Sequence, residues 1–328
     1  MLQHKELLHK RKNLLAFSGG VDSSALFFLL LEHHISFDIA IVDYGVRESS
    51  KEEVAFAKEL AKEHNLTCHT LKAPPIKSNF EANAREIRYS FFERLITQYS
   101  YNNLITAHHL GDRFEWMLMQ LCRGAGAVEL AGMQGVEQRG SYTLIRPLLV
   151  CDKNELLAYL KHNKLHYFVD ESNADEKYKR NYFRKHFTEP LLAEYKDGIA
   201  KSFVYLDADR ELLVSDSKIE RCNDFIYFSS HSLRSDIATL DKFLKTQGKV
   251  LTSHERELLQ MQECVVVGRE YVLSWWRGFV LLTPYVQTQK ITKEFKEKMR
   301  KLKLPPKMRS YFASDVEAFE VLESLAFA

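Results

Sequence analysis

Short apolar runs alternate with amphipathic segments through the first half of the chain. The spacing of the apolar positions predicts helices over 25–31, 51–64, 81–99 and 113–122. The apolar runs between them predict strands over 13–17, 37–43, 66–71, 103–107 and 142–145. Strands separated by helices of this length indicate βαβ units and a parallel sheet, and such sheets bind ligands at the carboxyl ends of their strands.

The pattern changes beyond about residue 195. Helical stretches predominate to about residue 262, and 264–285 is typical of short antiparallel strands that turn at Gly268 and at Arg277-Gly278. A length of 328 residues is compatible with two domains. We therefore expect a parallel-sheet, Rossmann-like α/β domain over 1–200 and a smaller mixed α+β domain over 201–328, with the boundary near 195–215.

Charge is nearly balanced over the whole chain but not locally. Lys and Arg number 46 and Asp and Glu 44, so a net charge of +2 creates no uniform positive field for a nucleic acid. Residues 290–309 nevertheless carry nine Lys or Arg and two Glu, which makes this segment +7 and the remainder −5. Any polyanion site must therefore be local.

Composition narrows the class of protein. Hydrophobic residues make up 45% of the chain and charged residues 27%, as in ordinary globular proteins. The conspicuous apolar stretch 25–31 is too short for a membrane span, and the N-terminal residues lack the apolar core of a secretory signal. The five cysteines are widely spaced without a CxxC pair, which argues against a disulfide framework, a zinc ribbon or an iron–sulfur cluster. We expect a cytoplasmic protein without a membrane partner.

The first predicted strand and helix are joined by a short polar loop, SGGVDSS at 18–24. Adjacent glycines let the backbone approach a ligand, and a helix start offers unpaired N–H groups, which favours a phosphate chain. Asp22 can either cap the helix or help to hold Mg²⁺. The loop lacks the GK[ST] ending of a Walker A motif. The plainer alternative is a tight turn with a good N-cap. The candidate nucleotide-binding residues are Ser18, Gly19, Gly20, Val21, Asp22 and Ser23.

A loop of this kind after the first strand resembles the signature of the PP-loop ATP pyrophosphatases, which split ATP into AMP and pyrophosphate. Within that superfamily, residues 1–190 resemble the tRNA(Ile)-lysidine synthases. The resemblance rests on VDYGVRESSKEE at 42–53, EANAREIRYSFF at 81–92, TAHHLGDRFEWMLMQLCRGAGAVELAGM at 106–133, RPLL at 146–149, and DESNAD and KRNYFR within 170–184. It implies a PP-loop fold, ATP, free L-lysine and tRNA(Ile) with a CAU anticodon. It also implies ligation of lysine to the wobble cytidine through an adenylated intermediate. The oligomeric state is left open, a homodimer included.

Two carboxylates follow the fourth predicted strand. His108-His109 end that strand, and Asp112 and Glu115 are three residues apart, so both carboxylates can point from one face of the next helix. They could hold Mg²⁺, orient an incoming ammonium group or accept its proton, whereas the alternative is that they cap the helix. The catalytic candidates are Asp22, His109, Asp112 and Glu115, and the magnesium candidates are Asp22 and Asp112.

The same block departs from the family pattern, which usually reads HHxDDQxET. Gly111, Arg113 and Trp116 stand at the first Asp, Gln and Thr positions, and Tyr44 replaces a His in the second block. The chain therefore lacks one carboxylate and carries a bulky aromatic side chain near the predicted site.

Several arginines are candidates for contacts with RNA. Glu81, Arg85 and Arg88 share one helical face, which fits either a solvated salt-bridged face or contacts with phosphates. Glycines at 124, 126, 132 and 135 predict a segment that closes over a substrate base, or an ordinary connection. A cationic helix follows a predicted capped turn at 170–173, and it either contacts phosphates or is a solvated face. The candidate RNA-binding residues are Arg85, Arg88, Arg123, Arg180 and Arg184.

Two other functions remain as alternatives. One is a tRNA thiolase that uses the same loop, although such enzymes commonly need paired cysteines or a cluster. The other is a catalytically weak tRNA-binding protein, which the departures at Gly111 and Trp116 motivate. For the lysidine-forming reaction we expect the second domain and its +7 segment to position tRNA through phosphate contacts.

Overall fold

A computed structural model describes residues 1–45, 49–76, 78–169, 177, 179–215, 217–287 and 291–327. The chain divides into two units, Met1–Ala208 and Asp209–Ala328. The predicted capped turn at 170–173, part of the second motif block (46–48) and the start of the basic segment (288–290) lie outside the described residues.

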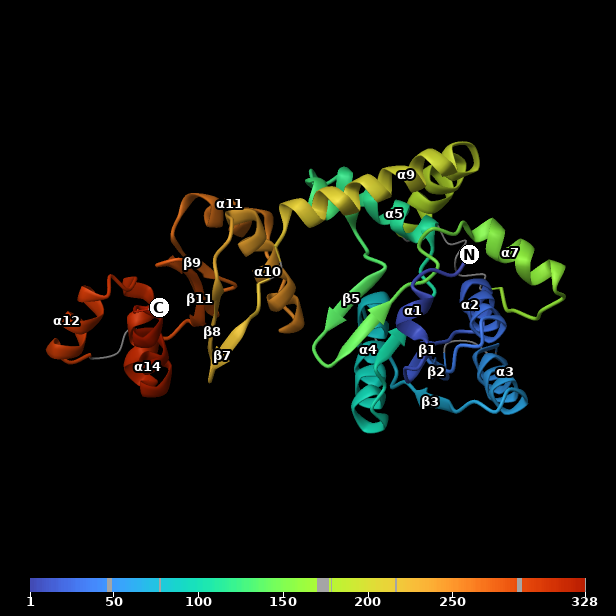
Figure 1. Ribbon diagram of the computed structural model, residues 1–328, viewed down its shortest axis with the longest axis horizontal. Coiled ribbons are helices and arrows are strands. Elements are labelled where there is room, and N and C mark those ends of the chain that lie inside the picture. The colour runs from blue at the N-terminus through green and yellow to red at the C-terminus, as the bar shows by residue number, and fades with distance from the viewer. Residues whose placement is uncertain are drawn as a thin grey trace. The chain divides into compact units, whose positions relative to one another are not determined.

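The N-terminal unit is built on a six-stranded sheet with the order β3-β2-β1-β4-β6-β5 (Figure 1). Five strands are parallel, and β5 pairs antiparallel with β6 at one edge. The prediction of a parallel sheet is confirmed, while the edge strand β5 was not predicted. The strands are β1 (Asn13–Ala16), β2 (Asp38–Asp43), β3 (Cys68–Lys72), β4 (Asn103–Ile105), β5 (Val136–Arg139) and β6 (Tyr142–Ile145).

Helices cover both faces of this sheet because successive strand residues point to opposite sides. Leu15 of β1 packs in a core formed with α2, α3 and α7, whereas Leu14 packs against α4 on the other face. The helices are α1 (Lys5–Leu8), α2 (Val21–Glu32), α3 (Ser49–Glu63), α4 (Phe80–Tyr99), α5 (Leu110–Leu121), α6 (Ala127–Ala131), α7 (Lys153–His162), α8 (Lys179–Phe183), the π-helix η2 (Arg184–Thr188) and α9 (Glu189–Leu213).

The C-terminal unit contains a five-stranded antiparallel sheet with the order β7-β8-β11-β10-β9. The hairpins predicted over 264–285 are confirmed, and both turns have positive φ at their glycines, +59° at Gly268 and +79° at Gly278. Helical structure was predicted up to residue 262, and this is wrong where two strands form between residues 220 and 229. The strands are β7 (Glu220–Cys222), β8 (Phe225–Ser229), β9 (Cys264–Val267), β10 (Tyr271–Trp276) and β11 (Phe279–Pro284).

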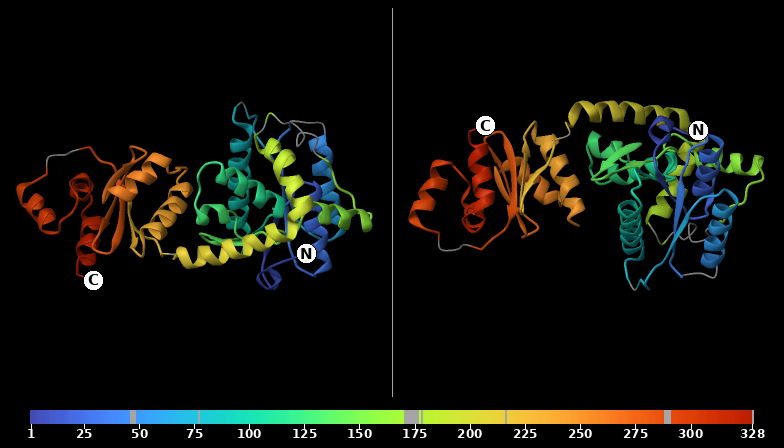
Figure 2. Two further views of the ribbon diagram at one scale, coloured as in Figure 1. Left: turned by 90° about the horizontal axis from the view of Figure 1, so that it is seen from above. Right: turned by 60° about the horizontal axis from the view of Figure 1, so that its bottom comes forward.

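This second sheet is also covered on both faces, as the two views of Figure 2 show. The apolar side chains of α10 and α11 pack on one face, and those of the last helices pack on the other. The helices are α10 (Leu233–Thr246), α11 (Ser253–Met261), α12 (Lys293–Lys301), the 3-10 helix η3 (Pro306–Met308), α13 (Arg309–Ser314) and α14 (Val316–Leu325). Among the described residues, no helix combines the length and apolar character that a membrane crossing requires.

Candidate active site

The polar loop at 18–24 curls between β1 and α2 in a form that leaves the helix start open. Gly19 has a φ of +76°, which a glycine adopts without steric cost. The hydroxyls of Ser18 and Ser23 lie 3.0 Å apart, and Ser24 Oγ donates to the Gly19 carbonyl at 3.1 Å. The N-cap of α2 is Gly20, without a side-chain cap, so Asp22 does not take the capping role considered for it. The first N–H groups of α2 are therefore available to a ligand.

A distant residue supports this loop. Phe168 N–H donates to the Gly19 carbonyl at 2.9 Å, and Gly20 and Phe168 form an isolated parallel bridge. The Phe168 ring lies 3.2 Å from the position that a Cβ on Gly19 would occupy. A side chain at residue 19 would consequently need both a strained φ and a displaced ring. The sequence contains no local signal for this contact, and it was not predicted.

Asp22 is the charged residue of the loop. Its Oδ1 atom is buried, and no hydrogen-bond partner for it lies within the described part of the chain. Burial raises the pKa of Asp22 above its usual value. A buried carboxylate oxygen without a partner suits Mg²⁺, which prefers oxygen ligands and is commonly completed by substrate phosphates.

His109 connects this loop with the start of α5. Its Nδ1 atom accepts a hydrogen bond from Gly111 N–H at 3.0 Å, which places the ring proton of the neutral form on Nε2. His109 Nε2 lies 3.8 Å from Asp22 Oδ2 and 3.5 Å from Asp112 Oδ2. Asp112 Oδ2 also accepts from the His109 backbone N–H at 3.1 Å, so it does cap the helix. The structure thus brings together three of the four predicted catalytic residues.

The second carboxylate, Glu115, joins the group through two arginines. Glu115 is only 1% exposed, and it accepts from Arg180 Nε and from Arg184 Nε, the latter at 2.9 Å. The same arginines reach Asp112 Oδ1, with Nη2 atoms at 3.1 Å from Arg180 and 3.4 Å from Arg184. Sequence reasoning selected all four residues, but not that they would pair with one another.

This pairing gives the two carboxylates different proton affinities. Burial raises the pKa of Glu115, even though Arg180 and Arg184 oppose the shift. Burial also acts on Asp112, but there the charges of the histidines and arginines around it prevail and hold the pKa below its usual range. The pKa values of the two carboxylates therefore shift in opposite directions, and Glu115 is the more readily protonated of the pair.

The neighbouring aromatic and basic side chains are held by other contacts. His108 Nδ1 lies 2.9 Å from Thr106 Oγ1, and burial lowers its pKa to about 4. Tyr44, which replaces the expected His, donates to the Ala84 carbonyl at 3.0 Å. The guanidinium of Arg85 stacks over Tyr89 at 4.7 Å.

Arg123 and the glycine-rich segment follow the far end of α5, whereas Arg88, the other remaining RNA candidate, is on α4. Arg123 is exposed just beyond that end, so it lies away from His109 at the other end of the helix. In the glycine-rich segment, residues 127–131 form the short helix α6, which begins after Gly126 and ends at Gly132 with a φ of +64°. Part of the segment is therefore helical.

The three family departures on α5 have distinct environments. Gly111 lies so close to the His109 ring that an added Cβ would be 2.7 Å from Cε1. Arg113 is buried, with Nη2 2.9 Å from the Ala131 carbonyl and 2.5 Å from Asp207 Oδ1. Trp116 is half-exposed and lies against Gly132.

Magnesium would depend on substrate oxygens at this site. Over the residues that the structure describes, no group of three or more His, Cys, Asp or Glu side chains is arranged to hold a metal ion. Asp22 fits Mg²⁺ through its unpaired Oδ1. Asp112 could contribute only if Arg180 and Arg184 gave up Oδ1. All five cysteines are free thiols.

Comparison with known proteins places this site in context. The PP-loop domain family matches residues 1–191. A tRNA(Ile)-lysidine synthase of Campylobacter jejuni strain RM1221 is 42% identical over 305 residues, which is 93% of each chain. Another, of Wolinella succinogenes, is 44% identical over 312 residues, 94% of this chain and 95% of the other. Among solved structures, a U34-tRNA thiolase of Methanococcus maripaludis aligns with a TM-score of 0.52 at 18% identity, covering 62% of this chain and 74% of that one. This last likeness concerns the fold alone.

Proposed function

The chain belongs to the tRNA(Ile)-lysidine synthase family of PP-loop proteins, and from that premise we propose how its site carries out the reaction. The enzyme uses ATP to form lysidine on tRNA(Ile). The observation that carries the assignment of roles is the contact chain of Asp22, His109 and Asp112, with separations of 3.8 and 3.5 Å. This series of contacts joins the nucleotide loop to the buried carboxylates.

In the first step, ATP occupies the loop 18–23, and the 2-oxo oxygen of the wobble cytidine in the CAU anticodon attacks the α-phosphate. The P–O bond to pyrophosphate breaks, and an adenylated cytidine remains. The open N–H groups at the start of α2 and the Ser18 and Ser23 hydroxyls stabilise the charge that develops on the phosphates. Mg²⁺ held by Asp22, with Asp112 as a second candidate ligand, would supply further neutralisation of that charge.

In the second step, the ε-amine of free lysine attacks C2 of the activated base, and AMP leaves. The incoming group is a cation in water, and Asp112 and Glu115 are the buried carboxylates that attract it. Of the two, Glu115 is the better proton acceptor because burial raises its pKa, whereas the pKa of Asp112 is lowered.

Without substrate, the two buried carboxylates are paired with two arginines. Arg180 and Arg184 neutralise Asp112 and Glu115 in the structure. When the lysine ammonium takes a place beside the carboxylates, a guanidinium is released and can bind an RNA phosphate instead. We therefore assign Arg180 and Arg184 to tRNA binding in the loaded enzyme, together with Arg85, Arg88 and Arg123.

Sulfur transfer is the less favoured alternative. The lysidine synthase relatives cover 93% or more of this chain at 42–44% identity, whereas the thiolase shares only the fold. No pair of the five cysteines has CxxC spacing.

The decisive experiment incubates the protein with ATP, radiolabelled lysine and a tRNA(Ile) transcript bearing the CAU anticodon. We expect label in the tRNA and one AMP released per lysine incorporated, and none with a UAU anticodon. Asp22→Asn should reduce the rate by about 100-fold or more, since it removes a group that acts on the transferring phosphates. Asp224→Asn, at an exposed position of the other unit, should leave the rate unchanged. Tight tRNA binding without incorporated label would refute the proposal.

A further inference from the structure

The C-terminal unit contains a pocket of about 390 Å³ whose lining combines aromatic and charged side chains. It opens beside the two-residue turn between β10 and β11. Arg277 at this turn is exposed and has a φ of +48°. The lining residues are Ser230, Glu263, Trp275, Trp276, Arg277, Gly278, Phe279, Lys303 and Pro305.

The aromatic wall of this pocket is held in place by a buried carboxylate. Asp236 is fully buried, and its Oδ2 atom accepts from Trp275 Nε1 at 2.8 Å and from Ser230 Oγ at 2.6 Å. A buried charge is costly unless hydrogen bonds compensate it. Here those bonds fix the orientation of two pocket residues, so the wall is formed before any ligand arrives.

The opposite wall is fixed in a similar way. Trp276 Nε1 donates to the Leu302 carbonyl at 2.9 Å, which holds the segment carrying Lys303 and Pro305 against the sheet. The Arg277 guanidinium lies over the Trp276 ring at 5.3 Å and donates to the Ala326 carbonyl at 3.0 Å. Two cationic side chains therefore stand at the rim of a preformed aromatic pocket.

We propose that this pocket binds one unpaired nucleotide of the substrate RNA. A nucleobase has flat faces, one of which stacks on Phe279, and its flanking phosphates suit Arg277 and Lys303. Glu263, the acidic residue of the lining, is complementary to an exocyclic amino group, which cytosine and adenine have and uracil lacks.

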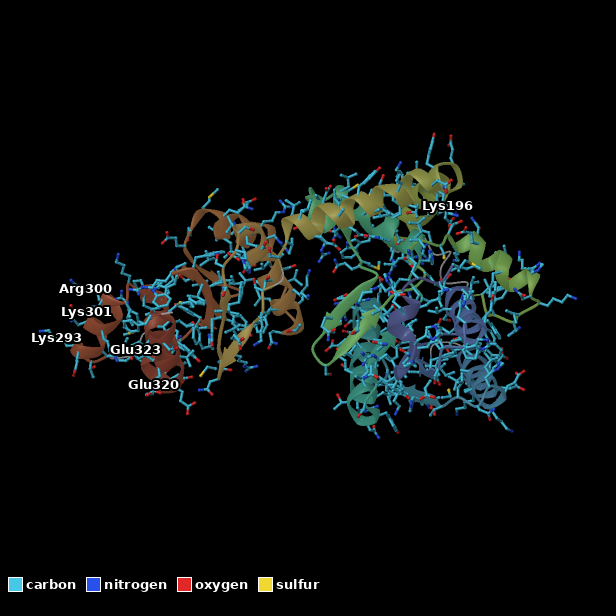
Figure 3. All side chains as sticks on the ribbon, viewed as in Figure 1. Lys196, Lys293, Arg300, Lys301, Glu320 and Glu323 are labelled. Atoms are coloured by element: carbon cyan, nitrogen blue, oxygen red, sulfur yellow. The ribbon has the colours of Figure 1, made fainter. Side chains whose placement is uncertain are left out.

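The neighbouring charge supports RNA as the occupant rather than a small apolar molecule. Lys303 lies two residues beyond the end of α12, whose Arg300 and Lys301 are labelled in Figure 3. These side chains continue the positive charge from the pocket rim along the helix. The inference rests on the proposed function, because tRNA is the nucleic acid that this enzyme modifies.

Tryptophan fluorescence tests the pocket in the full-length chain. The protein has three tryptophans, and Trp116→Phe leaves only the two that line the pocket. We expect single-stranded RNA tetramers of cytidine to quench this emission. Tetramers of uridine should bind several-fold more weakly, and a blunt RNA duplex should have no effect. Equal quenching by the duplex would overturn the proposal.

A pair of charge variants supplies the second test. Arg277→Gln with Lys303→Gln should weaken binding of the cytidine tetramer about tenfold and raise KM for tRNA, with kcat unchanged. The matched control, Lys218→Gln with Arg221→Gln, removes two exposed cations outside the pocket and should change neither value. Identical behaviour of the two double variants would refute the nucleotide pocket. If lysine incorporation failed in the wild type while quenching persisted, the proposed function would be wrong and the pocket would stand.

Discussion

Gly111 has no side chain, and this leaves room for the ring of His109. The family usually has Asp at this position. Here the His109 ring fills the space, and its Cε1 atom lies 2.7 Å from where a Cβ on residue 111 would lie. The ring is also bonded to Gly111 N–H. Glycine at residue 111 therefore allows His109 to turn back over the first turn of α5 and to face Asp22 and Asp112.

Restoring the family residue should consequently impair this enzyme. We expect Gly111→Asp and Gly111→Ala to lower activity about tenfold or more, because a displaced His109 no longer bridges the carboxylates. Crowding of the ring should cost about 1–2 kcal/mol of stability. Steady-state lysine incorporation and thermal unfolding of the ATP-free protein measure the two effects. Higher activity in Gly111→Asp would show that the missing carboxylate, and not the His109 contact, limits the site.

At this scale the sequence predicted residue types better than their partners. Asp112 and Glu115 are close in sequence, so helical spacing alone predicted a shared face. Their pairing with Arg180 and Arg184 crosses more than 60 residues, and no local pattern encodes it. Burial of Asp22 Oδ1 without a hydrogen-bond partner among the described residues likewise depends on the packing around it.

Among the helices, α5 is joined to two others through a single buried residue. Arg113 Nε and Nη2 donate to the Ala131 carbonyl at the end of α6, and Nη2 reaches Asp207 on α9. Its guanidinium also stacks over Phe203 of α9 at 4.3 Å. The arginine at this departure from the family pattern therefore connects α5 to α6 and α9.

Arg113→Gln, which introduces the usual family residue, should destabilise the N-terminal unit by about 2 kcal/mol. It removes charge-assisted hydrogen bonds and the stacking on Phe203. Asp207→Asn should cost less, about 1 kcal/mol, because Asp207 is 41% exposed and its charge is screened. Urea unfolding of both single variants and of the double variant would give the coupling between them. Additive changes in the free energy of unfolding would mean that this ion pair contributes nothing to stability.

Element prediction succeeded where a segment contains its own signal. The parallel strands and α2 to α5 follow from apolar spacing, since each forms from residues adjacent in sequence. Strand β5 was missed because it is a short edge strand with little buried surface, in which Glu137 pairs with Arg139 and Arg146. Strands β7 and β8 were missed because they are three and five residues long, between longer helical stretches.

Over the whole molecule, nearly neutral charge conceals a basic helix. Lys293, Arg300 and Lys301 extend from α12, while Glu320 and Glu323 lie on α14 (Figure 3). Lys298 is engaged with Glu323 at 2.7 Å, so it contributes less to an outer surface than its exposed neighbours. The exposed lysines of α12 are suited to RNA phosphates.

Changing Lys293, Lys296 and Lys301 to Gln should weaken tRNA binding and reduce its dependence on salt. Each lost phosphate contact lowers the slope of log K against log salt by about 0.7–0.9, so the slope should fall by about 2. The control replaces the three exposed lysines of α3, Lys51, Lys58 and Lys62, and should leave the slope unchanged. Filter binding at several salt concentrations measures both. An equal fall in the two triple variants would rule out α12 as a specific contact.

The contact between Phe168 and the Gly19-Gly20 turn has a consequence for synthesis of the protein. The loop emerges early from the ribosome, but the residue that bridges to it emerges only after the whole parallel sheet. A nascent chain that ends before residue 168 can form its strands yet lacks the support for its nucleotide loop. We therefore expect competence to bind ATP to arise late in translation, when most of the N-terminal unit is already available to fold around the loop.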